Sequence, residues 1–540
     1  MGRVNIVGAG LAGLSAAVHL AAQGVTCTLI SALPSERAQS VLAEGGINAA
    51  LDTMGEHDTP QEHFADTMKG GVDLADPAAV KGLTDHAPEI VRWLFSLGTP
   101  FQMERERLIL RNFGGQKKKR TAYARSSTGK VLMNALIDEA RRWESAGLIR
   151  RYPHHLAEEI KVESGRCAGL IVRDTYSGRL LDCRGPVILC SGGLNGLFPG
   201  LTTGTVPNTG SVTALAFAGG VALGNLEFIQ YHPTTVAIPG KRMLISEAAR
   251  GEGGRLYVLR DGRPWYFMEE KYPELGNLMP RDVVSREMFF VTRQADCGDQ
   301  VYLDLTGLPA ETWAKKLSDM REEIQHYLRI DPASVPVPVS PGIHFFMGGL
   351  LVDVHHRTSM PGLYAAGECA CQYHGANRLG GNSMLGALYG GQVAARSAAA
   401  LAREETGPDS EPADLGPAPA EWTAARAVSP AHTERLRDIL WDGLGIVREG
   451  SALGEALSRL EELSARPMSD WERARCLLGK AMLLSALARE ESRGAHYRSD
   501  HPRRDDARFQ KTTAAVCRDG EVSVSFRPIQ EGRPDHGTDP

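Results

Sequence analysis

The chain has 540 residues, of which 42% are hydrophobic and 23% charged, with a formal net charge of −5. This length predicts two to four domains, and the composition is that of a globular protein. The charge argues against nucleic acid as a partner, since no domain-wide basic field is present. Nine cysteines without a C-x-x-C motif argue against a cysteine-ligated iron–sulfur cluster or a structural zinc, so we expect no metal.

The same features predict where the protein works. An odd number of cysteines without framework spacing indicates reduced thiols and a cytoplasmic setting. The first predicted strand begins at residue 3 or 4, which leaves no room for a signal peptide. No apolar run approaches the roughly 20 residues of a membrane helix. We therefore expect contact with a membrane only indirectly, through a partner.

The first thirty residues predict a strand–turn–helix–strand unit, with strands over 4–7 and 25–30 and an Ala-rich helix over 12–23. The turn has the G-x-G-x-x-G spacing of a dinucleotide site, which permits a tight turn, close approach to a pyrophosphate and close helix–strand packing. The N–H groups at the helix start are free to bind phosphate. Ser31 ends the second strand, where an acidic residue often holds a ribose. The alternative is a tight turn in an unrelated α/β protein. The three glycines are Gly8, Gly10 and Gly13.

The next part of the chain alternates helices with glycine-containing loops. Small residues dominate 40–51 and would let the backbone approach a flat ligand. A polar loop at 111–125 contains the run from Lys117 to Arg120. That run predicts either a solvated basic patch or a surface that guides an anionic substrate or a partner. Helices are predicted at 63–71, 76–97 and 129–144.

From residue 160 onward the pattern changes twice. An α/β rhythm, with a glycine turn at 190–193, gives way between 225 and 344 to a stretch rich in His, Arg, Glu and Pro, which suggests an inserted domain. A Pro/Glu/Asp-rich linker follows at 404–420, and the tail from 492 is polar. Strands are predicted at 160–172, 180–189, 362–368 and 522–526, and helices at 211–217, 384–402 and within 431–491.

The inserted stretch and its borders hold local clusters of His, Arg, Ser and Glu. Taken singly, each has a structural explanation, such as a hydrogen-bonded loop histidine or a surface ion pair worth about 0–1 kcal/mol. Around a flavin, however, Arg offers a planar fork for a carboxylate, and His and Ser add donors. The clusters then predict a dicarboxylate site built from His232, Ser246, Glu247, Arg250, Arg281, His344 and Arg378.

Eleven blocks of sequence, in unbroken order and spread over nearly the whole chain, resemble the flavoprotein subunits of fumarate reductase and succinate dehydrogenase, with L-aspartate oxidase as the sister family. The blocks are GAGLAGLSAA (8–17), AEGGINAAL (43–51), HFADTMKGG (63–71), FGGQKKKRT (113–121), NLEFIQYHPT (225–234), RGEGG (250–254), PRD (280–282), HFFMGGL (344–350), GLYAAGE (362–368), HGANRLGGNSML (374–385) and ESRGAHYRSD (491–500).

The resemblance implies an α/β fold with a Rossmann-like FAD-binding domain, an inserted α+β capping domain that closes over the substrate, and a C-terminal helical domain. The implied boundaries are 1–228 and 344–403 for the FAD-binding domain, 229–343 for the capping domain, 404–420 for the linker, 421–495 for the helical domain and 496–540 for a C-terminal tail.

The resemblance also implies roles for the site residues. Arg281 would be the general acid that protonates the substrate carbon as N5 of the reduced flavin delivers hydride, and Glu247 and Arg250 would resupply its proton. A small dicarboxylate would be held by His232, Ser246, His344 and Arg378, beside Phe113. FAD would be bound by Gly8, Gly10, Leu11, Ala12, Gly13, Ser31, Ser40, Glu44, Gly45, Gly46, Ser191, Gly192, Glu368, Ser383 and Leu385.

Departures from the family pattern refine this expectation. Membrane-bound members attach flavin through a His five residues before the Glu of A-E-G-G, where this chain has Gln39, so FAD should be non-covalent and reduction of fumarate favoured. L-Aspartate oxidases carry a Glu where this chain has Phe113, so that activity ranks second. Ser211 replaces the Asp of T-G-D-G, so one FAD contact is lost or replaced.

The resemblance therefore implies FAD-dependent reduction of fumarate, or a related 2-enoate, to succinate. Electrons would come from a separate protein, such as an iron–sulfur subunit, or from a reductase. The alternatives are L-aspartate oxidase, a reductase of another unsaturated carboxylic acid, for which Phe345 and Phe346 leave room, and a non-catalytic flavin-binding assembly subunit. Retention of the dicarboxylate-binding set argues against the last.

Overall fold

The computed structural model describes residues 2–124, 127–404 and 411–529. At its centre lies a parallel five-stranded sheet in the order β21-β12-β1-β2-β8. Strands β1 and β12 are buried along their whole length, as expected for parallel strands covered on both faces. The strands are β1 (Val4–Val7), β2 (Cys27–Ser31), β8 (Ile149–Pro153), β12 (Val187–Leu189) and β21 (Leu363–Ala365).

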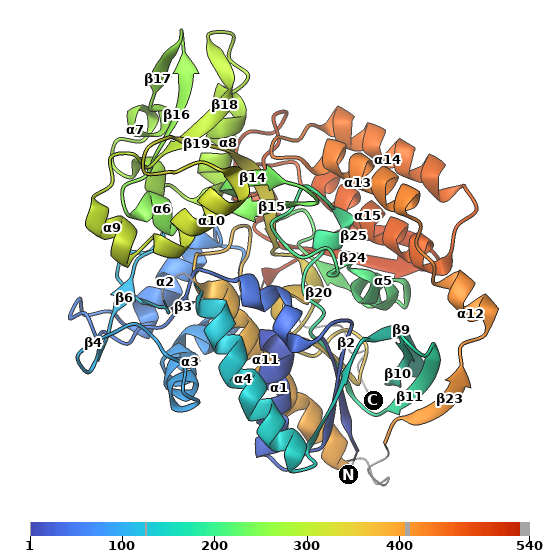
Figure 1. The fold of residues 1–540 in the computed structure, drawn as a ribbon. Helices are drawn as coiled ribbons and strands as arrows, with labels where there is room; N and C mark the ends of the chain where they lie inside the picture. Colours follow the sequence, from blue (N-terminus) through green and yellow to red (C-terminus); the bar gives the residue numbers. More distant parts are fainter. Residues whose placement is uncertain (1, 125–126, 405–410, 530–540) are drawn as a thin grey trace.

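Helices α1 (Leu11–Ala22), α4 (Thr128–Ser145) and α11 (Asn382–Glu404) lie together beside this sheet (Figure 1). Small residues let α1 and α11 approach closely, because a β-carbon on Gly391 would lie 2.3 Å from the carbonyl oxygen of Ala12. The predicted strand–turn–helix–strand unit is thereby confirmed, and with it the α/β fold class.

Capping residues set the starts of the next helices. Asp76 accepts hydrogen bonds from the amides of Ala78 and Ala79 at 2.8 and 3.1 Å, and a proline follows it as the first helical residue. These helices confirm the predicted segments to within a few residues. They are α2 (Pro60–Gly70), α3 (Pro77–Ser96) and α5 (Ser211–Ala218).

An antiparallel four-stranded sheet covers the other side of the central sheet, in the order β23-β11-β10-β9. Two predictions were wrong here. The segment 160–172 is not one strand, because a turn at Ser164 and Gly165, both with positive φ, separates β9 from β10. The segment 180–189 divides at Gly185 into β11 and β12, which lie in different sheets. The strands are β9 (His155–Glu163), β10 (Arg166–Asp174), β11 (Arg179–Arg184) and β23 (Ala413–Pro417), the last within the predicted linker, whose residues 405–410 lie outside the described part.

The segment predicted as an insertion forms a six-stranded sheet in the order β15-β14-β19-β18-β16-β17 with its own apolar core. We call residues 229–343 the cap. Strands β14 (Ile229–Ile238) and β19 (Val337–Phe346) pair antiparallel and lead into it from the rest of the molecule (Figure 1). The remaining elements are β15 (Lys241–Leu244), α6 (Ala248–Gly251), β16 (Arg255–Arg260), β17 (Arg263–Trp265), α7 (Phe267–Lys271), α8 (Arg281–Val291), β18 (Cys297–Asp304), α9 (Ala310–Lys315) and α10 (Ser318–Leu328).

The C-terminal part is more ordered than its polar sequence suggests. The predicted strand at 522–526 is confirmed as β25 (Glu521–Arg527), but a second strand was missed: β24 (Thr512–Arg518) pairs with β13 (Leu223–Gly224) as well as with β25. Buried ion pairs stabilise this C-terminal sheet. Arg489 donates to Glu227 at 2.6 Å and to Glu491 at 2.9 Å. The helices before it are α12 (Ala420–Ala425), α13 (Pro430–Leu444), α14 (Gly450–Ser464) and α15 (Asp470–Ala488), and α16 (Asp506–Phe509) precedes β24.

Short strands complete the fold. Part of the predicted polar loop is a strand, since β7 pairs with β3, while residue 125 lies outside the described part. Within the described ranges, no helix is both long and apolar enough to cross a membrane. The short strands are β3 (Ile47–Asn48), β4 (Met103–Glu104), β5 (Arg107–Leu108), β6 (Leu110–Arg111), β7 (Thr121–Ala122), β20 (Gly349–Leu351) and β22 (Ala370–Cys371).

Candidate active site

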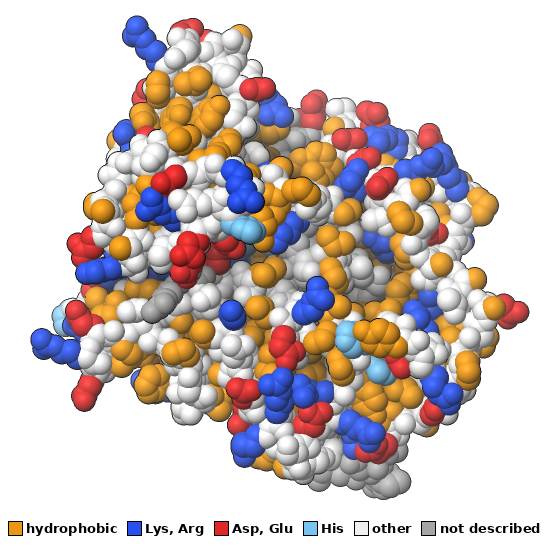
Figure 2. Space-filling model, viewed as in Figure 1, with side chains coloured by type: hydrophobic (Ala, Val, Ile, Leu, Met, Phe, Trp, Pro, Cys, Tyr) orange, Lys and Arg blue, Asp and Glu red, His pale blue; other side chains and the backbone are white. Residues whose placement is uncertain are grey.

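A cavity of about 940 Å³ runs from the carboxyl ends of β1, β2 and β12 to the cap. Parallel α/β sheets place their ligand sites at these strand ends. Acidic and basic side chains are interspersed over the face shown in Figure 2, with an acidic group over α10 of the cap. The cavity is long enough to be lined both by the glycine turn and by the predicted dicarboxylate residues.

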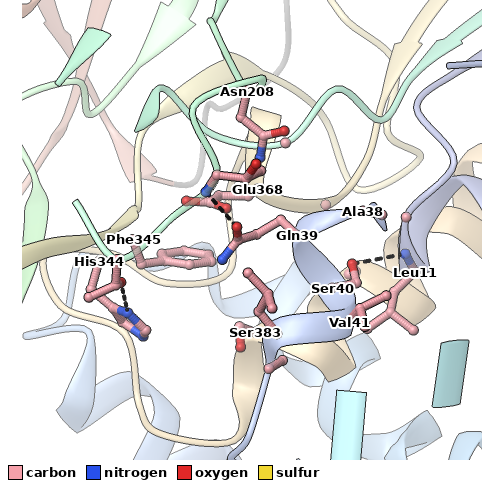
Figure 3. Close-up of a pocket in the computed structure, with 18 of the residues that line it drawn as sticks. Leu11, Ala38, Gln39, Ser40, Val41, Asn208, His344, Phe345, Glu368 and Ser383 are labelled. Carbon is pink, nitrogen blue, oxygen red and sulfur yellow. Dashed lines mark hydrogen bonds between the residues drawn. The ribbon is translucent and has the colours of Figure 1, made fainter. Parts of the chain in front are cut away.

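The glycine turn is shaped for a dinucleotide. A β-carbon on Gly8 would lie 2.1 Å from the carbonyl oxygen of Cys190, and one on Gly13 would lie 1.8 Å from that of Gly8. Helix α1 begins without a side-chain cap, although the amide of Leu11 donates to Ser40 Oγ at 3.1 Å (Figure 3). The hydroxyl of Ser191, at the end of β12, is buried without a partner. Free helix N–H groups and an unpaired hydroxyl fit the phosphates and ribose of FAD.

Most residues predicted to bind FAD line this cavity, with two exceptions. Gly13 packs the helix against the turn, as its spacing requires. Leu385 is completely buried in the core beside α1, because the first turn of α11 points its neighbour Met384 into the cavity instead. The lining includes Gly8, Gly10, Leu11, Ala12, Ser31, Ser40, Glu44, Gly45, Gly46, Ser191, Gly192, Glu368 and Ser383, and also Ser211 of the altered T-G-S-V motif.

Gln39 points into the cavity (Figure 3). Its side-chain oxygen accepts a hydrogen bond from the amide of Thr205 at 2.6 Å. An amide side chain forms no covalent bond to a flavin, but it donates and accepts hydrogen bonds.

Two carboxyl groups on the cavity wall have strongly perturbed pKa values. Burial raises the pKa of Glu368 to about 7, although the amide of Phe346 donates to it at 3.0 Å. Burial and the nearby Glu323 raise the pKa of Glu44 to about 8, against the opposing effect of Arg111. Carboxyl groups that stay partly protonated near neutral pH are common in ligand sites.

Arg281, Glu247 and Arg250 lie together at the cap end of the cavity. The first turn of α8 carries Arg281, whose Nε and Nη2 lie 2.9 and 2.8 Å from Glu247 Oε2. Arg250 Nη2 is 3.9 Å from Glu247 Oε1, which also accepts from the amide of Gly114 at 3.0 Å. Burial raises the pKa of Glu247, but Arg281 and Arg250 outweigh it and leave the pKa below its ordinary value. The carboxylate is therefore ionised between two cations.

The two predicted histidines are adjacent, with ring centroids 5.2 Å apart. His344 Nδ1 lies 2.8 Å from Thr203 Oγ1. Burial, followed by the charge of Arg281, lowers the pKa of both His232 and His344 well below the ordinary value. Both rings are thus neutral at neutral pH, and each presents a hydrogen bond rather than a charge.

Arg378 closes the site from the loop before α11. Its Nη2 donates to Gln230 Oε1 at 3.0 Å, its guanidinium lies over the ring of Phe345 at 4.3 Å, and its Nε is buried without a partner. Burial, followed by the charge of Arg281, lowers the pKa of Arg378 to about 9. A buried guanidinium with an unpaired donor is suited to bind an anionic ligand.

The structure therefore brings the predicted dicarboxylate set together. His232, Ser246, Glu247, Arg281, His344, Arg378 and Phe113 all line one cavity, and Arg250 lies behind Glu247. Gln230 was missed, although it stands two residues before His232 on β14, and alternate residues of a strand share a face. Asn377 was missed as well. No signal beyond its place beside Arg378 could have identified it.

The lysine-rich run beside the site divides into two parts. Arg120 does not belong to a solvated patch: it is completely buried, with Nη2 2.9 Å from Asp58 and 3.0 Å from Asp66. The surface lysines have acidic partners, since Lys118 lies 2.8 Å from Glu62. The prediction of a solvated patch was wrong for Arg120, because its side chain is buried in ion pairs with Asp58 and Asp66.

Known proteins share this architecture. The family model described as FAD binding domain matches residues 3–384, and the model described as Fumarate reductase flavoprotein C-term matches residues 473–534. The chain is similar to the succinate dehydrogenase flavoprotein subunit of Bacillus subtilis, at 35% identity over 95% of this chain and 93% of the relative. It is similar to the L-aspartate oxidase of Mesorhizobium japonicum, at 35% identity over 97% and 96%.

The fold is shared as well. A solved mutant of Escherichia coli quinol fumarate reductase superimposes with a TM-score of 0.86 at 29% identity, over 100% of both chains. The glycine turn, the dicarboxylate set and the C-terminal sheet lie within the matched regions. The chain therefore belongs to the family of FAD-containing flavoprotein oxidoreductases that includes succinate dehydrogenase, fumarate reductase and L-aspartate oxidase.

Proposed function

We propose that this protein reduces fumarate, or a closely related 2-enoate, to succinate. The observation that carries the proposal is the convergence of cations and neutral donors on one end of the cavity. Arg281 and Arg378 both donate to Gln230, and the neutral His232 and His344 lie beside them. Such a set of donors is complementary to a small dianion.

Each residue has a role in this proposal. Arg378, His232, His344 and Ser246 hold the two carboxylates and polarise the double bond as charge develops in the transition state. Arg281 transfers a proton to the substrate carbon. Glu247, which is ionised at rest, then takes up a proton that comes from solvent by way of Arg250 and passes it to Arg281, to which it is hydrogen-bonded. FAD, when bound, supplies the hydride.

FAD is non-covalent in this proposal, because Gln39 replaces the attachment residue. The residues that hold it are those of the cavity wall between the glycine turn and α11. Residues 229–343 form a capping domain that closes over the substrate, between the FAD-binding parts 1–228 and 344–403. The pairing of β14 with β19 at the base of the cap supports this division.

Electrons reach the flavin from a separate protein, an iron–sulfur subunit or a reductase. The relatives named flavoprotein subunits support this proposal. A cytoplasmic setting is part of it: all nine cysteines are free thiols, which is typical of reducing compartments. Association with a membrane would then be indirect.

L-Aspartate oxidase is the second candidate, because a relative with that name is as similar as the succinate dehydrogenase subunit. Phe113 argues against it. The ring lines the cavity next to Gly45 and is 7% exposed, so it offers no charge to a substrate ammonium group. Reduction of a bulkier unsaturated acid stays a third candidate, supported only by the rings of Phe345 and Phe346.

Two assays test the proposal. Steady-state oxidation of a reduced viologen dye by the FAD-loaded protein should depend on fumarate and yield succinate. L-Aspartate added without oxygen should leave the flavin absorbance unchanged. Bleaching by aspartate together with no fumarate turnover would instead assign the oxidase activity.

A further inference from the structure

Asn377 joins two parts of the chain that lie far apart in sequence. Its amide nitrogen donates to Asp282 Oδ1 at 2.9 Å, and its amide oxygen accepts from Gln230 Nε2 at 2.8 Å. Asp282 lies in the first turn of α8 on the cap, whereas Asn377 lies between β22 and α11, beside the FAD cavity. Asn377 is 6% exposed. One buried amide thus links the cap to the FAD-binding part.

The chain neighbours of this bond are the two arginines of the site. Arg281 precedes Asp282, and Arg378 follows Asn377. Both guanidinium groups donate to the same acceptor, Gln230 Oε1, Arg281 from Nη1 at 3.2 Å and Arg378 from Nη2 at 3.0 Å. The two guanidinium groups carry like charge and lie close to the same oxygen atom, so they repel each other. Other contacts must therefore hold both side chains in place.

The Asn377–Asp282 bond completes a ring of contacts that includes Arg281. The ring runs from Arg281 to Gln230, from Gln230 to Asn377, from Asn377 to Asp282, and back through the backbone to Arg281. Position 377 must both accept from an amide and donate to a carboxylate, which an asparagine does and an aspartate does not. Burial raises the pKa of Asp282, so a second carboxyl group beside it would repel it when both are ionised and would share one proton with it at lower pH.

We propose that Asn377 is a positioning residue that locks the closed cap onto the FAD-binding part through Asp282, and so fixes Arg281 relative to Arg378 across the substrate. The roles of the two arginines rest on the function proposed above. The lock itself is a contact between cap and body, whichever acid is reduced. Opening of the cap breaks the bonds of Asn377 to Asp282 and to Gln230, both of them cap residues, and moves Arg281 away from Arg378, and closing restores these contacts.

An exchange of the two side chains tests the lock. In N377D two carboxyl groups face each other, so kcat/KM for fumarate should fall by about 10-fold or more at alkaline pH, where both are ionised. In D282N an amide oxygen still accepts from Asn377, so kcat/KM should stay within about threefold. The double variant N377D/D282N re-creates a donor and an acceptor in exchanged positions, and kcat/KM should return to within about fivefold of the wild type.

Hydrogen exchange of the α8 amides supplies a readout that does not depend on turnover. In the FAD-loaded protein, these amides should exchange faster in N377D than in the wild type and should regain protection in the double variant. If N377D does not retain FAD, Asn377→Ser replaces it, because a serine hydroxyl is too short to reach both partners.

The results separate the two proposals. A double variant no better than N377D in both kcat/KM and α8 protection would overturn the lock. Wild-type activity and α8 protection in N377D would overturn it too. A wild-type protein that does not reduce fumarate would overturn the proposed function, and the α8 exchange of the variants would still decide the lock.

Discussion

Arg281 and Glu247 form a two-point contact, in which the Nε and Nη2 atoms of the arginine lie 2.9 and 2.8 Å from one carboxylate oxygen. The contact orients the guanidinium at the start of α8 and places an ionised carboxylate beside it. A proton given up by Arg281 could thus be replaced from the protein side rather than from the substrate side. The proposed proton transfer to the substrate depends on this pair.

Replacing Arg281 tests its role as proton donor. Arg281→Lys should lower kcat for fumarate by about 10² to 10⁴, the range that general acid–base catalysis contributes. FAD content should not change, because Arg281 lies at the cap end of the cavity. Steady-state kinetics with a reduced dye measures the effect. A kcat within a few-fold of the wild type would assign the proton to another group.

Glu368 should make the stability of the FAD-free protein depend on pH. Its pKa is about 7 in the folded protein and 4.5 in the unfolded chain. Between these values only the folded protein holds the proton, so the free energy of unfolding falls as pH rises, by about 3 kcal/mol in total. The contribution of Glu368 to the free energy of unfolding is fully present below pH 4.5 and is lost above pH 7.

The variant Glu368→Gln removes this titration. Thermal unfolding midpoints of the FAD-free wild type and of Glu368→Gln should diverge between pH 5 and pH 8, with the wild type losing more stability. Equal pH dependence of the two midpoints would show that the carboxyl is ionised throughout.

Arg120 should be essential for stability rather than for substrate guidance. Arg120→Met leaves the buried Asp58 and Asp66 without their cation, which should destabilise the fold by about 3–5 kcal/mol. Lys119→Ala, which breaks only a partly exposed pair with Glu56 at 3.4 Å, is the matched control and should cost less than about 1 kcal/mol. Thermal unfolding compares them. A fall in kcat/KM for Lys119→Ala would revive the guidance hypothesis.

Gly494 should matter for substrate affinity although it lies in the C-terminal part. A β-carbon there would lie 2.6 Å from the carbonyl oxygen of Ala376, in the loop that carries Arg378. Gly494→Ala should therefore displace that loop and lower kcat/KM for fumarate by about 10-fold or more. Gly520→Ala is the control, because Gly520 also has positive φ but no atom within 4 Å of a β-carbon. Equal kinetics in the two variants would contradict the effect.

Local patterns predicted the parts of the fold that local physics decides. The G-x-G-x-x-G turn and the helices α3 and α11 depend on neighbours in sequence, and each lies within a few residues of its predicted position. The tail was misjudged because Arg489 and Glu491 look like surface residues. Glu227, the partner of Arg489, lies more than 200 residues away in the chain, and no periodicity shows that such charges will be buried together.

The site shows the same division. His232, Arg281 and Arg378 were identified by residue type within recognisable blocks. Gln230 and Asn377 carry no charge, and their importance comes from bonds between segments that only the folded chain brings together. The side chain of Leu385 does not line the cavity, whereas that of Met384 does, because the turn of a helix, not the sequence block, decides which side chain faces the cavity.

The most direct test of the whole account is a single mixing experiment. FAD-loaded protein, photoreduced without oxygen, is mixed with fumarate while the flavin absorbance is recorded and succinate is assayed. The account predicts rapid reoxidation with one succinate formed per flavin. A flavin that stays reduced in a protein with full FAD content would contradict it and leave the fold without the proposed substrate.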